Sequence, residues 1–229
     1  MNELSLFTGA GGGLLASHIL GHNIVCAVER NEYCIEVLIQ RQNERALQPF
    51  PIWDDICTFD GRPWRGTVDL VSGGFPCQAF SSAARGRNIA EKDLWREMLR
   101  VIREIEPKVV FAENVSERAI LQAQNDLLEL GYNSKYIKLS AKDVGADHER
   151  DRYWLLAYTD YYGELCRTLN AKAQIVQELR NSVWATYPAE FRVLDGVAHR
   201  MDRLKALGNG QVPIVAASAW CELHKSVIQ

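Results

Sequence analysis

Long apolar runs are absent from this sequence of 229 residues. No run approaches the roughly 18 apolar residues that a membrane-spanning helix needs. The first residues, Met1-Asn2-Glu3, lack the basic start of a secretion signal. We therefore expect a protein that stays in the cytoplasm, where thiols are kept reduced.

Closely spaced cysteines are also absent, although the chain has six cysteines in all. They are scattered with no C-x-x-C spacing, which argues against a disulfide framework or a zinc ribbon. His18, His22 and Cys26 recur four residues apart, as metal ligands on one helix face would. Gly21 interrupts any helix there and no fourth ligand follows, so we expect no metal site.

An excess of positive charge is missing too, since the chain has 26 basic and 29 acidic residues and its net charge is −3. Any binding of nucleic acid must therefore come from a local basic face. One candidate set follows Cys77 and another lies near the end of the chain, although each set taken alone is typical of solvated surface: Arg85, Arg87 and Lys92, and Arg200, Arg203 and Lys205.

Alternating strands and helices are what the sequence does contain. An apolar strand over 4–7 breaks at Gly9, a helix over 12–20 follows, and a strand over 23–28 ends on Glu29 before a helix over 33–46. This βαβ beginning predicts an α/β fold with a mostly parallel, doubly wound sheet. Further strands are predicted over 50–53, 68–71, 109–112, 132–139 and 153–158, with helices over 90–106, 116–130, 175–179 and 213–225.

A glycine-rich turn, Phe7-Thr8-Gly9-Ala10-Gly11-Gly12-Gly13, joins the first strand to the first helix. It is not the dinucleotide fingerprint, because Leu14 stands where the third spaced glycine belongs. It still lets a ligand approach the backbone closely, and Glu29 lies about 20 residues further on, where an acid accepts from ribose hydroxyls. Taken alone, the turn is also compatible with an ordinary tight turn.

Cys77 follows a predicted strand and two glycines, in the stretch Gly73-Gly74-Phe75-Pro76-Cys77-Gln78. It is thus expected at the carboxyl end of a parallel strand, where open α/β sheets bind ligands. A thiol there can be a nucleophile, a metal ligand or a packing residue, and taken alone the packing role is favoured. Glu113 ends the next parallel strand, and with Arg152 it could equally form an interior ion pair.

Several stretches, in chain order, resemble the motifs of the DNA cytosine-5 methyltransferases. They are F-x-G-x-G-G from Phe7, P-C-Q around Cys77, L-W-R-E from Leu94, E-N-V from Glu113, R-x-R at Arg150 and Arg152, and a G-N-containing region over 208–213. The resemblance covers 1–158 and 203–229, which it implies to be the catalytic domain, and leaves 159–202 as a short target-recognition segment. It implies the S-adenosylmethionine-dependent methyltransferase (Rossmann-like) fold, whose last strand is antiparallel, and an activity often found in restriction–modification systems.

The resemblance also implies a chemistry. Cys77 would add to C6 of a cytosine flipped out of double-stranded DNA, which makes C5 nucleophilic. Glu113 would be the acid at N3, kept protonated by desolvation. Arg152 would contact the cytosine carbonyl oxygen, and Arg150 would support Glu113 or the backbone.

The implied methyl donor is S-adenosyl-L-methionine. We expect the chain to act as a monomer. The glycine turn would cradle its methionine end, Phe7 would lie against the adenine, Glu29 would take the ribose and Asp55 the adenine amine. The resemblance assigns the rest of the donor pocket to Thr8, Gly9, Gly11, Gly12, Pro76 and Asn209. It assigns DNA contacts to Gln78, Ser81, Arg85, Arg87, Arg167 and Arg192.

The chain departs from the family pattern at Ser5, where an acid is usual, and at His148, where a glutamine is usual. The segment 159–202 is short for reading bases, so we expect a target of about two to four base pairs or relaxed specificity. Two alternatives remain, an RNA (tRNA) cytosine methyltransferase of the same fold and a catalytically impaired DNA-binding relative. The presence of Cys77, Glu113 and Arg152 argues against the second.

Overall fold

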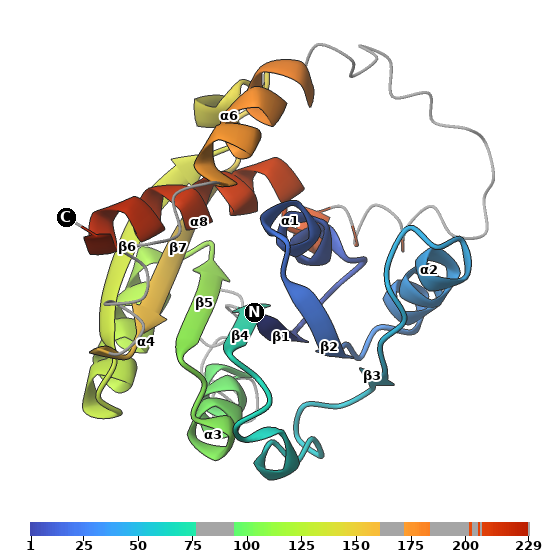
Figure 1. Cartoon of the computed structure of the whole chain (residues 1–229), viewed down its shortest axis with the longest axis vertical. Coiled ribbons are helices and arrows are strands. Elements are labelled where there is room, and N and C mark those ends of the chain that lie inside the picture. Colours follow the sequence, from blue (N-terminus) through green and yellow to red (C-terminus); the bar gives the residue numbers. More distant parts are fainter. Residues whose placement is uncertain (77–93, 161–171, 184–201, 203–205, 207, 229) are drawn as a thin grey trace, which may run out of the picture.

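The computed structural model describes residues 1–76, 94–160, 172–183, 202, 206 and 208–228. Within them lies one sheet of seven strands in the order β3-β2-β1-β4-β5-β7-β6 (Figure 1). Every pairing from β3 through β5 is parallel, whereas β7 runs antiparallel to both β5 and β6. The expected doubly wound sheet with an antiparallel last strand is therefore confirmed. The strands are β1 (Asn2–Leu6), β2 (Asn23–Val28), β3 (Ile52–Trp53), β4 (Leu70–Gly74), β5 (Val109–Asn114), β6 (Asn133–Ser140) and β7 (Asp151–Tyr158).

Helices cover both faces of the sheet (Figure 1). On one face lie α3 (Leu94–Ile105) and α4 (Glu117–Glu129), whose apolar stripes form one core with β1 and β5. On the other face, α1 (Gly12–Leu20) and α8 (Pro213–Ile228) pack on β4 and β5, α6 (Lys172–Val183) lies on α8, and α2 (Glu32–Asn43) lies beside α1. Short 3₁₀ turns occur at η1 (Arg62–Trp64) and η5 (Lys142–Val144). No helix in these described ranges is long and apolar enough to cross a membrane.

The strand order reverses at β1. The chain leaves β1 for β2 and β3 on one side, then returns to β4 and β5 on the other, so the crossover helices separate between β1 and β4. Parallel sheets bind ligands at such a switch point, outside the carboxyl ends of the strands. The glycine turn after β1 and the residues after β4 both lie at this edge.

Some element boundaries differ from the sequence-based expectation. β4 extends through Gly73 and Gly74, because both pair with β5 in the ladder, opposite Ala112 and Glu113. β7 begins at Asp151 rather than 153, which puts Arg152 on a strand instead of in a connector. The helix expected over 175–179 spans the twelve residues of α6.

Helix starts also differ in their capping. Asn31 caps α2, since its Oδ1 accepts from the backbone N–H of Cys34 at 3.1 Å. Ser116, a residue type that favours the cap position, precedes α4 there, but its hydroxyl makes no capping bond. Asn114 Oδ1 instead accepts from the Ser116 N–H at 2.9 Å.

Candidate active site

A cavity of about 610 Å³ opens at the carboxyl ends of β1, β2, β4 and β5. Its size suits a cofactor or small ligand. The cavity brings together residues far apart in the sequence, and its lining includes Phe7, Gly9, Glu29, Asp55, Pro76, Glu113, Arg152 and Asn209. Eight of the residues assigned from sequence thus surround one space.

Glu113 is the buried acid of this cavity, with 7% of its surface exposed. The β5 ladder fixes its backbone between Gly74 and Trp154. Arg152 Nε lies 3.0 Å from its Oε1. Burial raises the pKa of Glu113 above its usual range, and the opposing effects of Arg152, Gln211 and Arg150 do not cancel that rise. A carboxyl in this state holds its proton to a higher pH than an exposed one.

Arg150 does not contact Glu113 directly, although the sequence left that open. Its Nη2 donates to the carbonyl oxygens of Gly208 and Gly210, each at 2.7 Å. Burial and the nearby Arg152 lower the pKa of Arg150. Arg150 therefore fixes the segment that leads into α8 against the site.

Asn114 connects the ends of β4 and β5. It is 2% exposed, and its Nδ2 donates to the Phe75 carbonyl at 2.8 Å while its Oδ1 accepts from the N–H of Ser116, just before α4. The backbone just before Pro76 is thereby held to the strand that carries Glu113. This role of Asn114 was not assigned from sequence, although its place in the E-N-V stretch was a signal.

The opposite wall of the cavity is built around Glu29, at the end of β2. Its Oε2 accepts from the Gly9 N–H at 2.6 Å, and its Oε1 accepts from the Asn31 N–H at 2.8 Å. Each carboxylate oxygen keeps a further lone pair for a ligand hydroxyl. Phe7 and Gly9 have φ of 53° and 58°, a conformation that costs a non-glycine residue such as Phe7 energy and often accompanies function.

Three residues assigned to the donor pocket lie outside the lining of the large cavity. The Thr8 hydroxyl points inward and donates to the Ser5 carbonyl at 3.0 Å. A Cβ on Gly11 would lie 3.0 Å from the Leu38 side chain, and one on Gly12 would overlap the Gln211 carbonyl oxygen. In this structure the three shape the turn by close packing.

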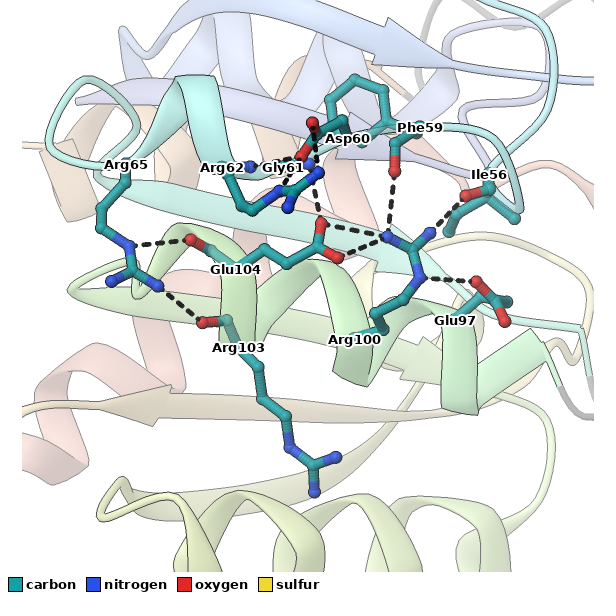
Figure 2. A network of polar contacts seen from close by, with 10 residues as sticks. All are labelled: Ile56, Phe59, Asp60, Gly61, Arg62, Arg65, Glu97, Arg100, Arg103 and Glu104. Carbon is teal, nitrogen blue, oxygen red and sulfur yellow. Dashed lines mark hydrogen bonds and ion pairs between the residues drawn. The ribbon is translucent and has the colours of Figure 1, made fainter.

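The residues that follow Asp55 are held by Arg100 of α3, as Figure 2 shows for Ile56 and Phe59. Arg100 Nη2 donates to the Ile56 carbonyl at 2.6 Å and Nη1 donates to the Phe59 carbonyl at 2.9 Å. Glu97 and Glu104 pair with the same guanidinium at 2.8 and 2.9 Å. Because α3 follows the segment 77–93, this arginine network ties the donor side of the cavity to the helix after the P-C-Q stretch.

The remaining assigned residues lie outside the described ranges: Cys77, Gln78, Ser81, Arg85, Arg87, Arg167 and Arg192. Among the described residues, no group of three or more His, Cys, Asp or Glu could hold a metal ion. His22, one of the three residues spaced like metal ligands, lies with its Nδ1 3.0 Å from Glu3 Oε2.

Comparison with known proteins identifies the family to which the chain belongs. A model of the C-5 cytosine-specific DNA methylases matches residues 1–202, most of the chain. The chain belongs to this family. The resemblance seen in the motifs is thereby confirmed.

Curated members of the family include bacterial type II methyltransferases. The chain is 36% identical over 144 residues to M.Eco47II of Escherichia coli, covering 56% of this chain and 32% of that protein. It is 29% identical over 164 residues to M.HhaI of Haemophilus parahaemolyticus, covering 68% and 48%. Among solved structures, the Dnmt2 methyltransferase of S. pombe shares the fold with a TM-score of 0.56 and 21% identity, covering 70% of this chain and 49% of that one. The chain thus spans about a third to a half of the length of these relatives.

Proposed function

We propose that this chain is a DNA cytosine-5 methyltransferase that transfers a methyl group from S-adenosyl-L-methionine to C5 of a flipped cytosine, through a covalent adduct with Cys77. One observation carries the proposal: the buried Glu113–Arg152 pair and the Glu29 carboxylate face the same 610 Å³ cavity. The acid that protonates the cytosine and the carboxylate that binds the ribose of the methyl donor thus line the same cavity.

The donor fits the residues on its side of the cavity. A nucleoside with free ribose hydroxyls needs a fixed acceptor, and Glu29 is held by two backbone N–H donors with lone pairs to spare. A Cβ on Gly9 would meet nothing within 4 Å, so the turn leaves open space beside the backbone. When bound, the donor supplies an electrophilic methyl group on a sulfonium, so the proposal requires no metal.

The chain's own residues act on the cytosine. The Cys77 thiolate forms a bond to C6, and the electron pair displaced from the ring makes C5 nucleophilic while Glu113 gives its proton to N3. Arg152 would hold the base oxygen beside that acid. After transfer, loss of the C5 proton to solvent and release of the thiolate restore the ring, and the N3 proton returns to Glu113.

We also propose that residues 159–202 read a short target in double-stranded DNA. Part of that segment is used within the fold: Val176 of α6 is buried against α8, and Arg180 donates to the Asp143 carbonyl at 2.9 Å. Few side chains are then left to contact base edges, which supports a target of about two to four base pairs. Bisulfite sequencing of plasmid DNA from a host that expresses the chain measures the site, and more than six defined base pairs would contradict this reading.

Labelled methyl donor, incubated with the chain and either duplex DNA or tRNA, tests the proposed activity. We expect label in DNA, a covalent adduct with DNA that carries 5-fluorocytosine, and neither with Cys77→Ala. Label in tRNA alone would favour the RNA enzyme. Donor binding without transfer to either substrate would favour the catalytically impaired relative.

A further inference from the structure

We propose that Gln211 is a positioning residue that holds the Glu113 carboxyl and links it to the glycine turn on the donor side of the cavity. The inference rests on the function proposed above, in which Glu113 is the acid. Gln211 is 98 residues from Glu113 in the sequence, just before α8. It lies in the G-N-containing region over 208–213, where the family resemblance assigned a role to Asn209 and none to Gln211.

The two carboxyl oxygens of Glu113 have different partners from different elements. Arg152 of β7 approaches Oε1 at 3.0 Å, and Gln211 Nε2 donates to Oε2 over a long 3.5 Å. Without Gln211, the carboxyl would be held at one oxygen only. It could then turn about its terminal bond, and the oxygen that carries the proton would no longer face one fixed direction.

Gly13 and Gly74 lie beside the Gln211 side chain, where an added Cβ would crowd it. A Cβ on Gly13 would lie 2.6 Å from Gln211 Oε1, and one on Gly74 would lie 3.2 Å from Nε2 and 2.6 Å from Glu113 Oε2. Such distances are too short for ordinary contact. The amide therefore occupies a slot between the start of α1 and the end of β4, so the donor turn and the acid share one side chain.

Arg150 fixes the backbone of this segment. Its Nη2 donates to the Gly208 and Gly210 carbonyls on the N-terminal side of Gln211, at 2.7 Å each. Both arginines that surround the acid thus serve Glu113, Arg152 by contact and Arg150 through Gln211. The described groups with charge near Glu113 are these two arginines, and Gln211 adds a neutral dipole.

A carboxamide suits a partner that changes its protonation state. Its N–H donates to a carboxylate, and after rotation about its last bond its oxygen accepts from a carboxylic acid. Gln211 can therefore keep a hydrogen bond to Glu113 before and after the proton moves to the base, and the contact in this structure, from Nε2 to Oε2, is the one that favours the charged form. An apolar side chain of the same length can do neither.

Gln211→Met, which keeps the length and loses the amide, is the direct test. We expect turnover to fall roughly 10- to 100-fold, the scale of a misplaced catalytic group. The affinity for S-adenosylmethionine, measured by calorimetry, should stay within about 3-fold of the parent. Glu29, the carboxylate proposed to bind the ribose, is unchanged in this variant. In ¹³C NMR of the chain without substrate, the Glu113 carboxyl, assigned with Glu113→Gln, should titrate at higher pH than in the parent, because a hydrogen bond that favours the charged form is gone.

Gly13→Ala gives a second variant that leaves Gln211 in the chain. Alanine favours the helix at this position, but its Cβ would push on Gln211 Oε1. We expect normal folding with the same upward shift in the Glu113 titration. Gln124→Met on α4, which removes a surface amide that donates to Ser134, is the matched control and should change neither turnover nor titration.

The NMR readout separates this inference from the proposed function. If the parent chain methylates no DNA, the proposed function fails, and the titration still reports on the Gln211–Glu113 contact. An unchanged Glu113 titration in both Gln211→Met and Gly13→Ala would overturn the inference, whatever the activity. Equal losses in Gln124→Met would overturn it as well.

Discussion

Two arginines of this protein meet glutamate side chains in opposite surroundings. Arg100 is 32% exposed and pairs with Glu97 and Glu104, which are 31% and 23% exposed (Figure 2). Arg152 is 19% exposed and pairs with Glu113, whose side chain is 9% exposed. The first arginine also donates to two backbone carbonyls, whereas the second donates to one, that of Asp151, and lines a cavity.

The difference in burial and in the number of partners decides the protonation. Burial lowers the pKa of Arg100, but its bonds to Glu97 and Glu104 outweigh this and raise it, so the guanidinium holds its proton more firmly than a free one. At Glu113 burial outweighs the single close arginine, and the pKa of the acid rises. The same residue types therefore form a network of ion pairs around Arg100, and at Glu113 a carboxyl that holds a proton it can give up.

Glu113→Gln should have the largest effect on function, because it keeps the shape and removes the proton. We expect turnover to fall by roughly 100-fold or more, with little change in donor affinity by calorimetry. Glu97→Gln is the matched control on the other arginine, and its turnover should stay close to that of the parent. A large loss of donor affinity in Glu113→Gln would place this carboxyl in the donor pocket instead.

Glu29→Ala extends the comparison to a fourth glutamate, whose partners are two backbone N–H groups rather than an arginine. Its loss removes a charged acceptor for ribose hydroxyls, so donor binding should weaken by about 1.5–3 kcal/mol. Isothermal titration with the methyl donor measures this. Unchanged affinity would contradict the assigned orientation of the donor.

Arg100→Met should affect stability more than chemistry. It leaves Glu97 and Glu104 without their cation and two carbonyls without a donor, yet water reaches the site, so we expect a loss of about 1–2 kcal/mol in the free energy of unfolding. Urea denaturation measures it. A turnover loss as large as that of Glu113→Gln, with stability unchanged, would erase the distinction between the two arginines.

The smallest effect concerns pH and stability. The pKa of Glu113 is raised in the folded chain above its ordinary 4.5, so the unfolded chain gives up this proton first as pH rises. The stability of the parent relative to Glu113→Gln should therefore fall between pH 4.5 and the higher folded value, and be constant on either side. Thermal unfolding at a series of pH values tests the sign, and a relative stability that rises through this window would refute a neutral buried acid.

Much of the fold follows from local sequence patterns. Apolar runs that end in Glu29 and Glu113 marked strands whose last residues reach the ligand edge, and Gly12–Leu20 matched α1 in full. Strand and helix periods are local, so they can be read from one chain. The extension of β4 through two glycines could not, because it depends on pairing with other strands: Gly73 pairs with both β1 and β5, and Gly74 pairs with β5.

The candidate site was predictable where a residue type is tied to a strand end, and less so where tertiary contacts decide. Thr8 and Gly12 belong to the glycine turn, yet packing directs them away from the large cavity. Gln211 had no local signal of its own, since its partner Glu113 is 98 residues away. Which of two arginines touches the acid likewise depends on where β7 begins.

The approach of Gln211 to Gly12 has a consequence for the order of folding. Two residues near opposite ends of the chain must meet before the slot exists, and loop closure over such a separation is slow compared with helix and hairpin formation. Refolding should therefore restore far-ultraviolet circular dichroism, which reports the elements, before it restores the titration of Glu113. The lag between the two signals would measure the time between formation of the secondary structure and docking of α8 with the segment that carries Gln211.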